Sequence, residues 1–306
     1  MKKHSNSIYR YSCKIGPLLL AIGWLGGSTM TTALAQTTPD QTSPATTPGP
    51  AQVKYIPQRL DDIAWENDRI AHRIYGPALE KKSFTGSGID VWVKSTRNYI
   101  IDEWYKRGDY HLDRGDGLDF YDVGHSRGCG GLGIWDGTQL YTSGHWVSYE
   151  IKDTGPQRAV WTLKYAPWNI QGGKQVSEDR TMSLEPGTNL TRLESTLTSD
   201  LPELTVGIGI AKRKGPGGDL DQDKEKGIMC YWQPPDPVHG VIGCAVIVNP
   251  ADVVGFAEDK LNYLILIKVK PGVPFVYRAG ACWSKGLDFH TADDWKNYII
   301  QQAAAK

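Results

Sequence analysis

Apolar and polar residues alternate along much of this chain, which is the pattern of strands that bury one face. In residues 88–95, apolar side chains occupy one set of alternate positions, whereas Asp90, Trp92 and Lys94 occupy the other set. Residues 61–79 also alternate small or apolar residues with charged ones. Both segments are therefore expected to form strands with one face toward a core.

Turn residues such as Asp136-Gly137 and Pro186-Gly187 separate a long series of similar apolar segments further along the chain. The expected strands after residue 137 are 138–142, 146–153, 158–165, 174–184, 189–198, 203–212, 228–233, 241–249, 263–270 and 274–282.

Helical spacing is confined to two segments. Residues 98–107 place their large apolar side chains three and four positions apart, and residues 291–305 do the same behind Thr291, which is a suitable N-cap. A dozen short strands with so little helix predict an all-β fold, an antiparallel sandwich with a short C-terminal helix.

The first residues have the order of a secretory signal peptide, because a basic stretch and an apolar run precede Ala33-Leu34-Ala35. We expect a signal peptide over 1–35, a disordered Thr/Pro-rich linker over 36–51 and a single β-sandwich domain over 52–306. The mature protein is expected in the periplasm or outside the cell, without a membrane span, since no later segment is long and uncharged enough.

The charge balance argues against a nucleic-acid partner. Removal of the four basic residues among the first 35 leaves 30 basic against 34 acidic side chains. A chain with this balance has no electrostatic footprint for phosphate backbones.

Four cysteines follow the signal peptide: Cys129, Cys230, Cys244 and Cys282. An oxidising compartment permits one disulfide among the last three, although these three also lie in apolar contexts where cysteine serves as a small buried hydrophobe. Their spacing matches no CxxC zinc pattern.

The most unusual stretch is 110–137, YHLDRGDGLDFYDVGHSRGCGGLGIWDG, in which charged residues and histidines lie among many glycines. It matches the G-x-S-x-G and G-x-G-x-x-G motifs, but the strand and helix that those motifs require on either side are missing from the pattern. The polar residues themselves are the candidates for chemistry, because histidine exchanges protons near neutral pH and arginine binds carboxylates. These candidates are His111, His125 and Arg127.

Two alternatives to an active site remain open for this stretch. It is also compatible with a turn-rich loop of Asx-turns, and with a zinc or calcium site built from His111, Asp113 and His125. The alternating acids of residues 219–225 most resemble a solvated loop, with a structural cation as the other interpretation. We expect no cofactor beyond such a divalent cation.

A second polar set lies in residues 65–77, where Arg69, His72 and Arg73 could meet the glycine-rich stretch across a sheet. A polar strand face paired with acids on a neighbouring strand explains these residues equally well. Most tryptophans are expected in the core. Those beside polar or glycine-rich chain are candidate sugar platforms, namely Trp92, Trp135, Trp146 and Trp283.

Several of these stretches carry a family resemblance. The segments RLDDIAWENDRIAHRIYGPALE, SGIDVWVK and AGACWSKGLDFHTADDWKNYI, together with the glycine-rich stretch, resemble a secreted bacterial family known as domain of unknown function 4861. That family is similar to the galactose-mutarotase-like β-supersandwich group and accompanies enzymes that degrade uronate-containing polysaccharides. The resemblance implies a carbon–oxygen lyase or dehydratase that acts by β-elimination on a uronate-containing oligosaccharide or polysaccharide.

An elimination of this kind needs three groups, which neutralise the uronate carboxylate, remove the C5 proton and protonate the C4 oxygen. We assign Arg127, with Arg69, to the first role, His111 or His125 to the second, and Tyr110 or Tyr121 to the third. The expected substrate-binding residues are Arg69, His72, Arg73, Lys94, Trp135 and Trp283. A mutarotase-like epimerase and a non-catalytic carbohydrate-binding domain are the alternatives.

Overall fold

A computed structural model describes residues 50–82 and 86–305. The expected signal peptide at 1–35 and the linker residues 36–49 lie outside the described residues. The described residues belong to one compact unit that is built almost entirely from antiparallel strands. Within them, no helix combines the length and the apolar character needed to cross a membrane.

The N-terminal strands form a five-stranded sheet in chain order. Its strands are β1 (Gln52–Ile56), β2 (Asp62–Glu66), β3 (Ile70–Ile74), β4 (Ile89–Lys94) and β5 (Gly117–Leu118). The helices around this sheet are η1 (Pro57–Arg59), α1 (Pro77–Glu80) and α2 (Ile101–Arg107).

Two further sheets complete the structure. The eight-stranded sheet has the order β13 (Asp219–Asp223), β14 (Ile228–Trp232), β15 (Ile242–Val248), β18 (Phe275–Trp283), β11 (Leu190–Thr198), β10 (Gln175–Leu184), β9 (Ala159–Asn169) and β8 (Trp146–Thr154). The second five-stranded sheet has the order β16 (Val253–Glu258), β17 (Asn262–Val269), β12 (Leu204–Ala211), β6 (Cys129–Trp135) and β7 (Leu140–Tyr141). The remaining helices are η2 (Gln171–Gly173), η3 (Pro250–Asp252) and α3 (Ala292–Ala304).

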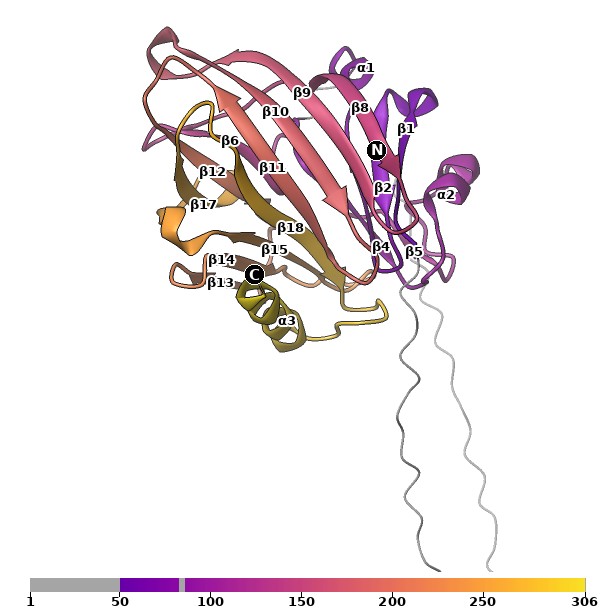
Figure 1. Cartoon of the computed structure of the whole chain (residues 1–306). Helices are drawn as coiled ribbons and strands as arrows, with labels where there is room; N and C mark the ends of the chain where they lie inside the picture. Colours follow the sequence, from indigo (N-terminus) through magenta and orange to yellow (C-terminus); the bar gives the residue numbers. More distant parts are fainter. Residues whose placement is uncertain (1–49, 83–85, 306) are drawn as a thin grey trace, which may run out of the picture. The chain divides into compact units, whose positions relative to one another are not determined.

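The two five-stranded sheets are joined into one layer, which the eight-stranded sheet covers (Figure 1). A bridge between Ile89 and Gly128 links the start of β4 to the residue before β6. Across the layers, the rings of Trp65 and Trp161 lie 5.0 Å apart, and the Tyr277 hydroxyl donates to the Gly130 carbonyl at 3.0 Å. The predicted antiparallel β-sandwich with a short C-terminal helix is therefore confirmed.

Both predicted helices are present and cover outer sheet faces. α2 packs its buried Trp104 on Trp92 of β4, with ring centroids 5.3 Å apart. α3 lies against β14 and β15, and Thr291 caps it as expected, since its side chain accepts from the backbone N–H of Asp294. The side chain of Asp294 accepts in turn from the N–H of Thr291, which completes a capping box.

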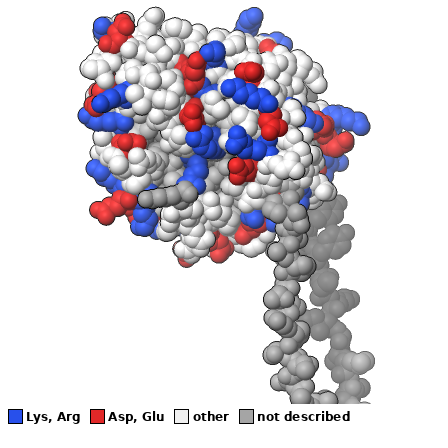
Figure 2. Space-filling view, viewed as in Figure 1, with Lys and Arg blue, Asp and Glu red and all other residues white. Residues whose placement is uncertain are grey.

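Charged side chains of both signs are interspersed on the face of the molecule that Figure 2 shows. On the eight-stranded sheet, Lys164 pairs with Asp179 at 2.7 Å and Arg192 pairs with Glu194 at 2.7 Å. Exposed pairs such as these contribute little to stability. Because each pair combines a positive and a negative charge, they do not give this sheet a surface of a single charge sign.

Two segments that were expected to be loops are strands. Residues 219–223 form the edge strand β13, where Asp221 pairs with Lys296 of α3 at 3.1 Å. The glycine-rich residues 129–135 form β6, which lies between β12 and the edge strand β7. Glycine is needed there because neighbouring chain comes very close: a Cβ at Gly130, whose φ is +97°, would lie 2.2 Å from the Cβ of Ala279.

The four described cysteines are free and buried, so the disulfide that the sequence permitted is absent among them. Strand register explains this. Cys244 of β15 lies opposite Ala281, and Cys230 of β14 lies opposite Ala245, so the side chain of Cys244 points to the other face from those of Cys230 and Cys282. Cys244 belongs to the main core, whereas Cys230 and Cys282 pack under α3.

A buried ion pair holds α2 on the first sheet. Glu66 accepts from the backbone N–H groups of Ile100 and Ile101 at the start of α2, at 2.9 and 3.0 Å. Glu66 also accepts from Gln52 Nε2 at 2.7 Å and pairs with Lys94, whose Nζ lies 3.0 Å from Oε2. Neither side chain of the Glu66–Lys94 pair is exposed. Burial lowers the pKa of Lys94, although Glu66 opposes this effect. Lys94 was expected to bind substrate, but this structure gives it a fully buried partner.

This pair predicts the effect of Glu66→Gln. The glutamine can still accept from the start of α2, but it leaves the Lys94 ammonium buried without a counter-charge, which costs about 3–5 kcal/mol. Denaturant unfolding should show this loss, and adding Lys94→Met should recover part of it because the buried charge is then gone. A Glu66→Gln single variant as stable as the wild type would contradict this account.

Candidate functional site

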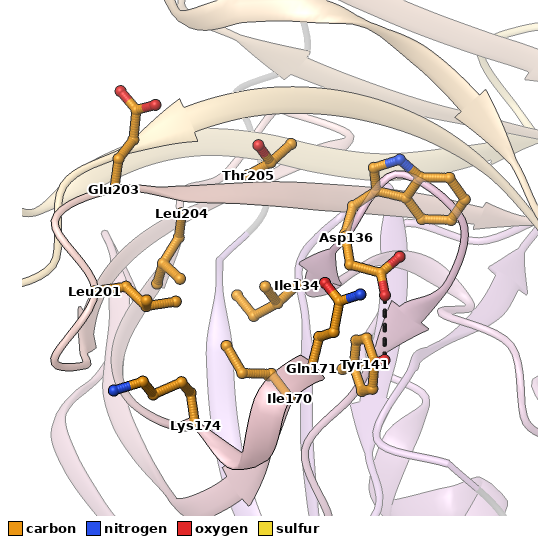
Figure 3. A pocket seen from close by; sticks show the side chains of 11 residues that line it. Ile134, Asp136, Tyr141, Ile170, Gln171, Lys174, Leu201, Glu203, Leu204 and Thr205 are labelled. Atoms are coloured by element: carbon orange, nitrogen blue, oxygen red, sulfur yellow. Dashed lines mark hydrogen bonds between the residues drawn. The ribbon is translucent and has the colours of Figure 1, made fainter.

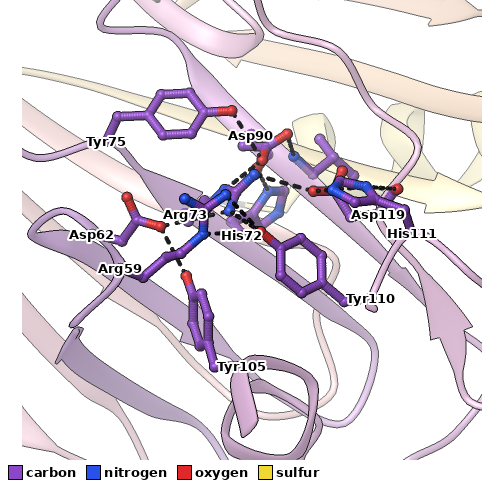
Figure 4. A network of polar contacts seen from close by, with 11 residues as sticks. Arg59, Asp62, His72, Arg73, Tyr75, Asp90, Tyr105, Tyr110, His111 and Asp119 are labelled. Carbon is purple, nitrogen blue, oxygen red and sulfur yellow. Dashed lines mark hydrogen bonds and ion pairs between the residues drawn. The ribbon is translucent and has the colours of Figure 1, made fainter. Parts of the chain in front are cut away.

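The candidate site is centred on Arg73, which β3 holds on the outer face of the first sheet (Figure 4). Register places Arg73 opposite Asp90 of β4, and its Nε donates to Asp90 Oδ2 at 2.7 Å. Nη2 donates to Asp119 Oδ2 at 3.1 Å, and Nη1 lies 3.5 Å from Asp62 Oδ2. The side chain of Arg73 is only 6% exposed. One guanidinium thus contacts carboxyl groups from three separate segments.

Aromatic side chains enclose this guanidinium. Its central carbon lies 5.0 Å from the ring centroids of both Tyr75 and Trp92, and 5.6 Å from that of Tyr110. Such faces attract a cation through the ring quadrupole. The Tyr75 hydroxyl donates to Asp90 Oδ2 at 3.2 Å, and the Tyr110 hydroxyl accepts from Arg59 Nη2 at 2.7 Å. The guanidinium of Arg73 is therefore largely shielded from water.

The charges of this cluster balance only if one carboxyl group keeps its proton. Three carboxyl groups, those of Asp62, Asp90 and Asp119, share two guanidinium groups, those of Arg73 and Arg59. Burial raises the pKa of Asp62 to about 6 and also raises the pKa of Asp90. Burial, followed by the charge of Asp90, holds the pKa of Asp119 well above its usual range. We therefore expect Asp119 to be the group that retains the proton.

A pocket of about 280 Å³ opens over this cluster. Arg73 and Tyr75 line it from the end of β3, whereas His111 and residues 119–123 line it from the segments on either side of β5. The His111 side chain is 64% exposed. Its Nδ1 lies 2.8 Å from the backbone oxygen of Asp119 and 3.8 Å from the carboxyl Oδ2 of the same residue. A carboxylic acid, an imidazole and a phenol therefore face one cavity.

Some of the predicted site residues meet here. His111, Arg73 and Tyr121 line the pocket, and Tyr110 lies behind it with its hydroxyl bound to Arg59 and Arg73. The Tyr121 hydroxyl points into the core, where it lies 3.8 Å from the thiol sulfur of Cys244. The expected meeting of the arginine strand with the glycine-rich stretch thus occurs through Arg73.

Other predicted residues lie elsewhere. Arg127 is 1% exposed in the core, where its Nη1 donates to Ser87 Oγ at 3.1 Å and to the Leu132 carbonyl at 3.3 Å. Burial lowers its pKa to about 10. Arg127 is not among the side chains that line the pocket, and neither is the exposed His125. Arg127 is unsuited to binding a substrate carboxylate because substrate cannot reach it.

The expected substrate-binding residues are also dispersed. His72 points to the inner face of the sheet, where burial lowers its pKa to about 4. Arg69 pairs with Asp288 at 3.2 Å. Trp283 is buried, and its indole N–H donates to the His239 carbonyl at 2.7 Å. Trp92 and Trp146 are also buried. Trp135, which is partly exposed, lines a different pocket.

The expected metal ligands are not brought together. Asp113 accepts from the backbone N–H groups of Gly115 and Gly117, which is the Asx-turn alternative for this loop. Among the residues that the structure describes, no group of three or more His, Cys, Asp or Glu side chains is placed to hold a metal ion.

A family model described as "Domain of unknown function (DUF4861)" matches residues 26–305. The chain belongs to the DUF4861 family. The resemblance found in the sequence is confirmed.

A curated relative of this DUF4861 protein is "Uncharacterized protein P7" from Formosa agariphila. It is 35% identical over 265 residues, which cover 80% of this chain and 65% of the relative. The chain thus spans less than two thirds of that relative's length.

Two solved structures are similar at low identity. They are the galactosidase domain of the α-galactosidase-sucrose kinase AgaSK, with a TM-score of 0.36, and the GH36 α-galactosidase AgaB from Geobacillus stearothermophilus, with a TM-score of 0.37. Each is 9% identical, and the matches cover 77% and 76% of this chain but only 42% and 41% of those chains.

Sequence reasoning missed several lining or supporting residues of the DUF4861 site, among them Tyr75 and Asp90. Tyr75 lies two positions after Arg73 and Asp90 lies four positions before Lys94, so the period of two does place them on the outer face. Asp119 was noticed only as one member of the polar stretch. Their importance depends on the partners that the sheet brings to them, which no local pattern specifies.

The proton on Asp119 predicts the pH dependence of Asp119→Asn. Because folding raises the pKa of Asp119, its protonated carboxyl group stabilises the fold fully below the unfolded-state pKa near 3.8. This stabilisation is lost as the pH rises toward the folded-state pKa. Asparagine has the same shape and does not titrate. The stability of the variant should therefore fall less steeply above pH 4 than that of the wild type, by about 1.4 kcal/mol per pH unit.

Urea unfolding of both proteins at a series of pH values measures this difference. If Asp119 were ionised in the folded protein, the variant would instead lose a buried ion pair. It would then be about 3–5 kcal/mol less stable than the wild type at neutral pH.

Proposed function

We propose that this DUF4861 protein is a carbohydrate-active carbon–oxygen lyase that acts by β-elimination on uronate-containing oligosaccharides or polysaccharides. The observation that supports this most is that one pocket is lined by His111 and by Asp119, whose buried carboxyl group has a pKa well above its usual range. The reaction needs a group that tolerates a substrate carboxylate and a base next to it. The resemblance in sequence points to the same substrate class.

Asp119 is the proposed neutralising group. An ionised carboxylate would repel a uronate, whereas a carboxylic acid can donate its proton in a hydrogen bond to it. This bond withdraws charge from the substrate carboxylate and makes the neighbouring C5 proton more acidic. Arg73 supports the interaction from behind, because its Nη2 donates to Asp119 Oδ2. Asp119 thus takes the role that the sequence suggested for Arg127.

His111 is the proposed base. Its Nδ1 faces the Asp119 backbone oxygen, which can only accept a hydrogen bond, so Nδ1 carries the ring proton. Nε2 then has a free lone pair and can remove the C5 proton. Because the side chain is 64% exposed, it can reach a sugar that is bound at the mouth of the pocket.

Tyr75 is the proposed acid. Its pKa is held well above 10 by burial and by the charge of Asp90, so the hydroxyl keeps its proton until the C4 oxygen departs. The C5–H and C4–O bonds break and a C4=C5 double bond forms. The C5 proton goes to His111, the Tyr75 proton goes to the leaving oxygen, and water restores both groups. A sugar on that oxygen makes the enzyme a lyase, and a free hydroxyl makes it a dehydratase.

A substrate screen tests the proposal. Ulvan, alginate, glucuronan and pectic oligomers are incubated with the protein, and the conjugated double bond of the product is followed by its ultraviolet absorbance. Absorbance that grows with time supports elimination. Binding without absorbance would instead favour a carbohydrate-binding domain, and interconversion of anomers without absorbance would favour an epimerase.

The two histidines of the glycine-rich stretch provide a matched pair of variants. His111→Ala removes the proposed base and should lower kcat by roughly 10²–10⁴-fold. His125→Ala removes an exposed imidazole that does not line the pocket, so the rate should be unchanged. Thermal melts should show both variants folded. Equal rates for the two variants would contradict the role of His111.

A further inference from the structure

A second pocket lies at the far end of β6 from the candidate site. Trp135 ends this seven-residue strand, whereas the loop with Asp119 precedes it, and the two pockets share no lining residue. The pocket has a volume of about 310 Å³ and is drawn in Figure 3. Residues of β6, β7 and β12 and of the connection between β9 and β10 line it, so the sheets hold its walls in place.

The lining combines an apolar floor with aromatic side chains. Ile134, Ile170 and Leu204 supply apolar surface, and Trp135 and Tyr141 supply the rings. Trp135 and Tyr141 are only partly buried, which leaves ring surface available to a ligand. The axial C–H groups of a pyranose are weakly positive and pack well on the negative face of such a ring. This lining therefore suits a sugar ring better than it suits the flat surface of a partner protein.

Polar groups at the pocket are fixed in orientation. Asp136 Oδ1 accepts from the backbone N–H groups of Thr138 and Gln139, each at 2.8 Å, and its Oδ2 accepts from the Tyr141 hydroxyl at 3.1 Å. These bonds lower the pKa of Asp136, so it is a permanent acceptor for sugar hydroxyls. This environment is opposite to that of Asp119, and it suits binding rather than proton transfer.

Among the remaining polar groups, Lys174 offers a cationic partner to an acidic sugar. Glu203 is already paired with Lys268 at 2.5 Å, so its charge is compensated. Lys174 lines the same pocket, and it has no acidic partner among the residues that the structure describes. Gln171, which is exposed on the η2 turn, adds an amide that can both donate and accept. One free cation thus remains available for a carboxylate.

We propose that this pocket is a second carbohydrate-binding site, which holds a pyranose ring of the uronate-containing chain away from the reacting bond. The ring packs on Trp135, hydroxyl groups bind Asp136 and Gln171, and the carboxylate binds Lys174. The choice of a uronate chain rests on the proposed function, whereas the binding site itself does not. A second site of this kind keeps a long chain attached while another part of it occupies the Asp119 pocket.

Affinity electrophoresis tests this site without relying on catalysis. Full-length protein is run through native gels that contain the polysaccharides of the substrate screen, and its retardation is compared with that of Trp135→Ala and Lys174→Ala. Both variants should lose at least about tenfold in affinity, which corresponds to roughly 1.4 kcal/mol. Tyr149→Ala and Lys152→Ala, which change exposed side chains of β8 outside the pocket, should be retarded like the wild type.

The outcomes separate this site from the proposed reaction. If both proposals hold, Trp135→Ala should cleave short oligomers at the wild-type rate and long polymers more slowly. If no polymer yields an unsaturated product, loss of retardation in the two pocket variants still supports the binding site. Retardation of Trp135→Ala and Lys174→Ala equal to that of the wild type would overturn it. Lys174 and Gln171 are exposed, so Lys174→Ala and Gln171→Ala keep the test valid even if Trp135→Ala does not fold.

Discussion

The structure of the candidate site depends on one buried guanidinium. Arg73 has to be neutralised because an unpaired charge is costly in the interior. Its partners, Asp62, Asp90 and Asp119, come from β2, β4 and the glycine-rich stretch. Meeting this one electrostatic requirement therefore fixes two strands and the loop against each other. The contact between Arg73 and Asp119 forms the floor of the pocket, and it also holds the loop that lines the pocket.

The same requirement creates the chemistry. Three ionised carboxyl groups around two guanidinium groups would leave one excess negative charge in a buried cluster. A proton on Asp119, whose pKa burial holds well above its usual range, would remove that charge. A buried carboxylic acid is a useful group for a substrate that itself carries a carboxylate. At the far end of β6, backbone N–H groups instead keep Asp136 ionised. One chain thus presents two carboxyl groups whose pKa values are shifted in opposite directions by their surroundings.

Alternation in the sequence predicts most strands, and it even identifies the face of β4 on which Asp90, Trp92 and Lys94 lie. It fails at β6, because glycines there serve close contacts with other strands, and these contacts are not visible locally. Gly209 of β12 shows the reason: a Cβ there would lie 2.7 Å from the side chain of Arg127. Nothing in the local sequence distinguishes Arg127 from a surface arginine, yet its side chain is packed in the core. Likewise, Arg73 and Asp119 are 46 positions apart, so only the assembled sheet shows that they meet.

The central claim is that Asp119 carries a proton in the folded protein at neutral pH. Carbon-13 NMR of aspartate-labelled protein measures this directly, when the side-chain carboxyl signal is assigned by comparison with Asp119→Asn and followed through a pH titration. The account predicts a signal that remains in its protonated position through pH 7. Titration near the usual aspartate value of about 4 would contradict it, because the cluster would then hold its excess negative charge without the proton.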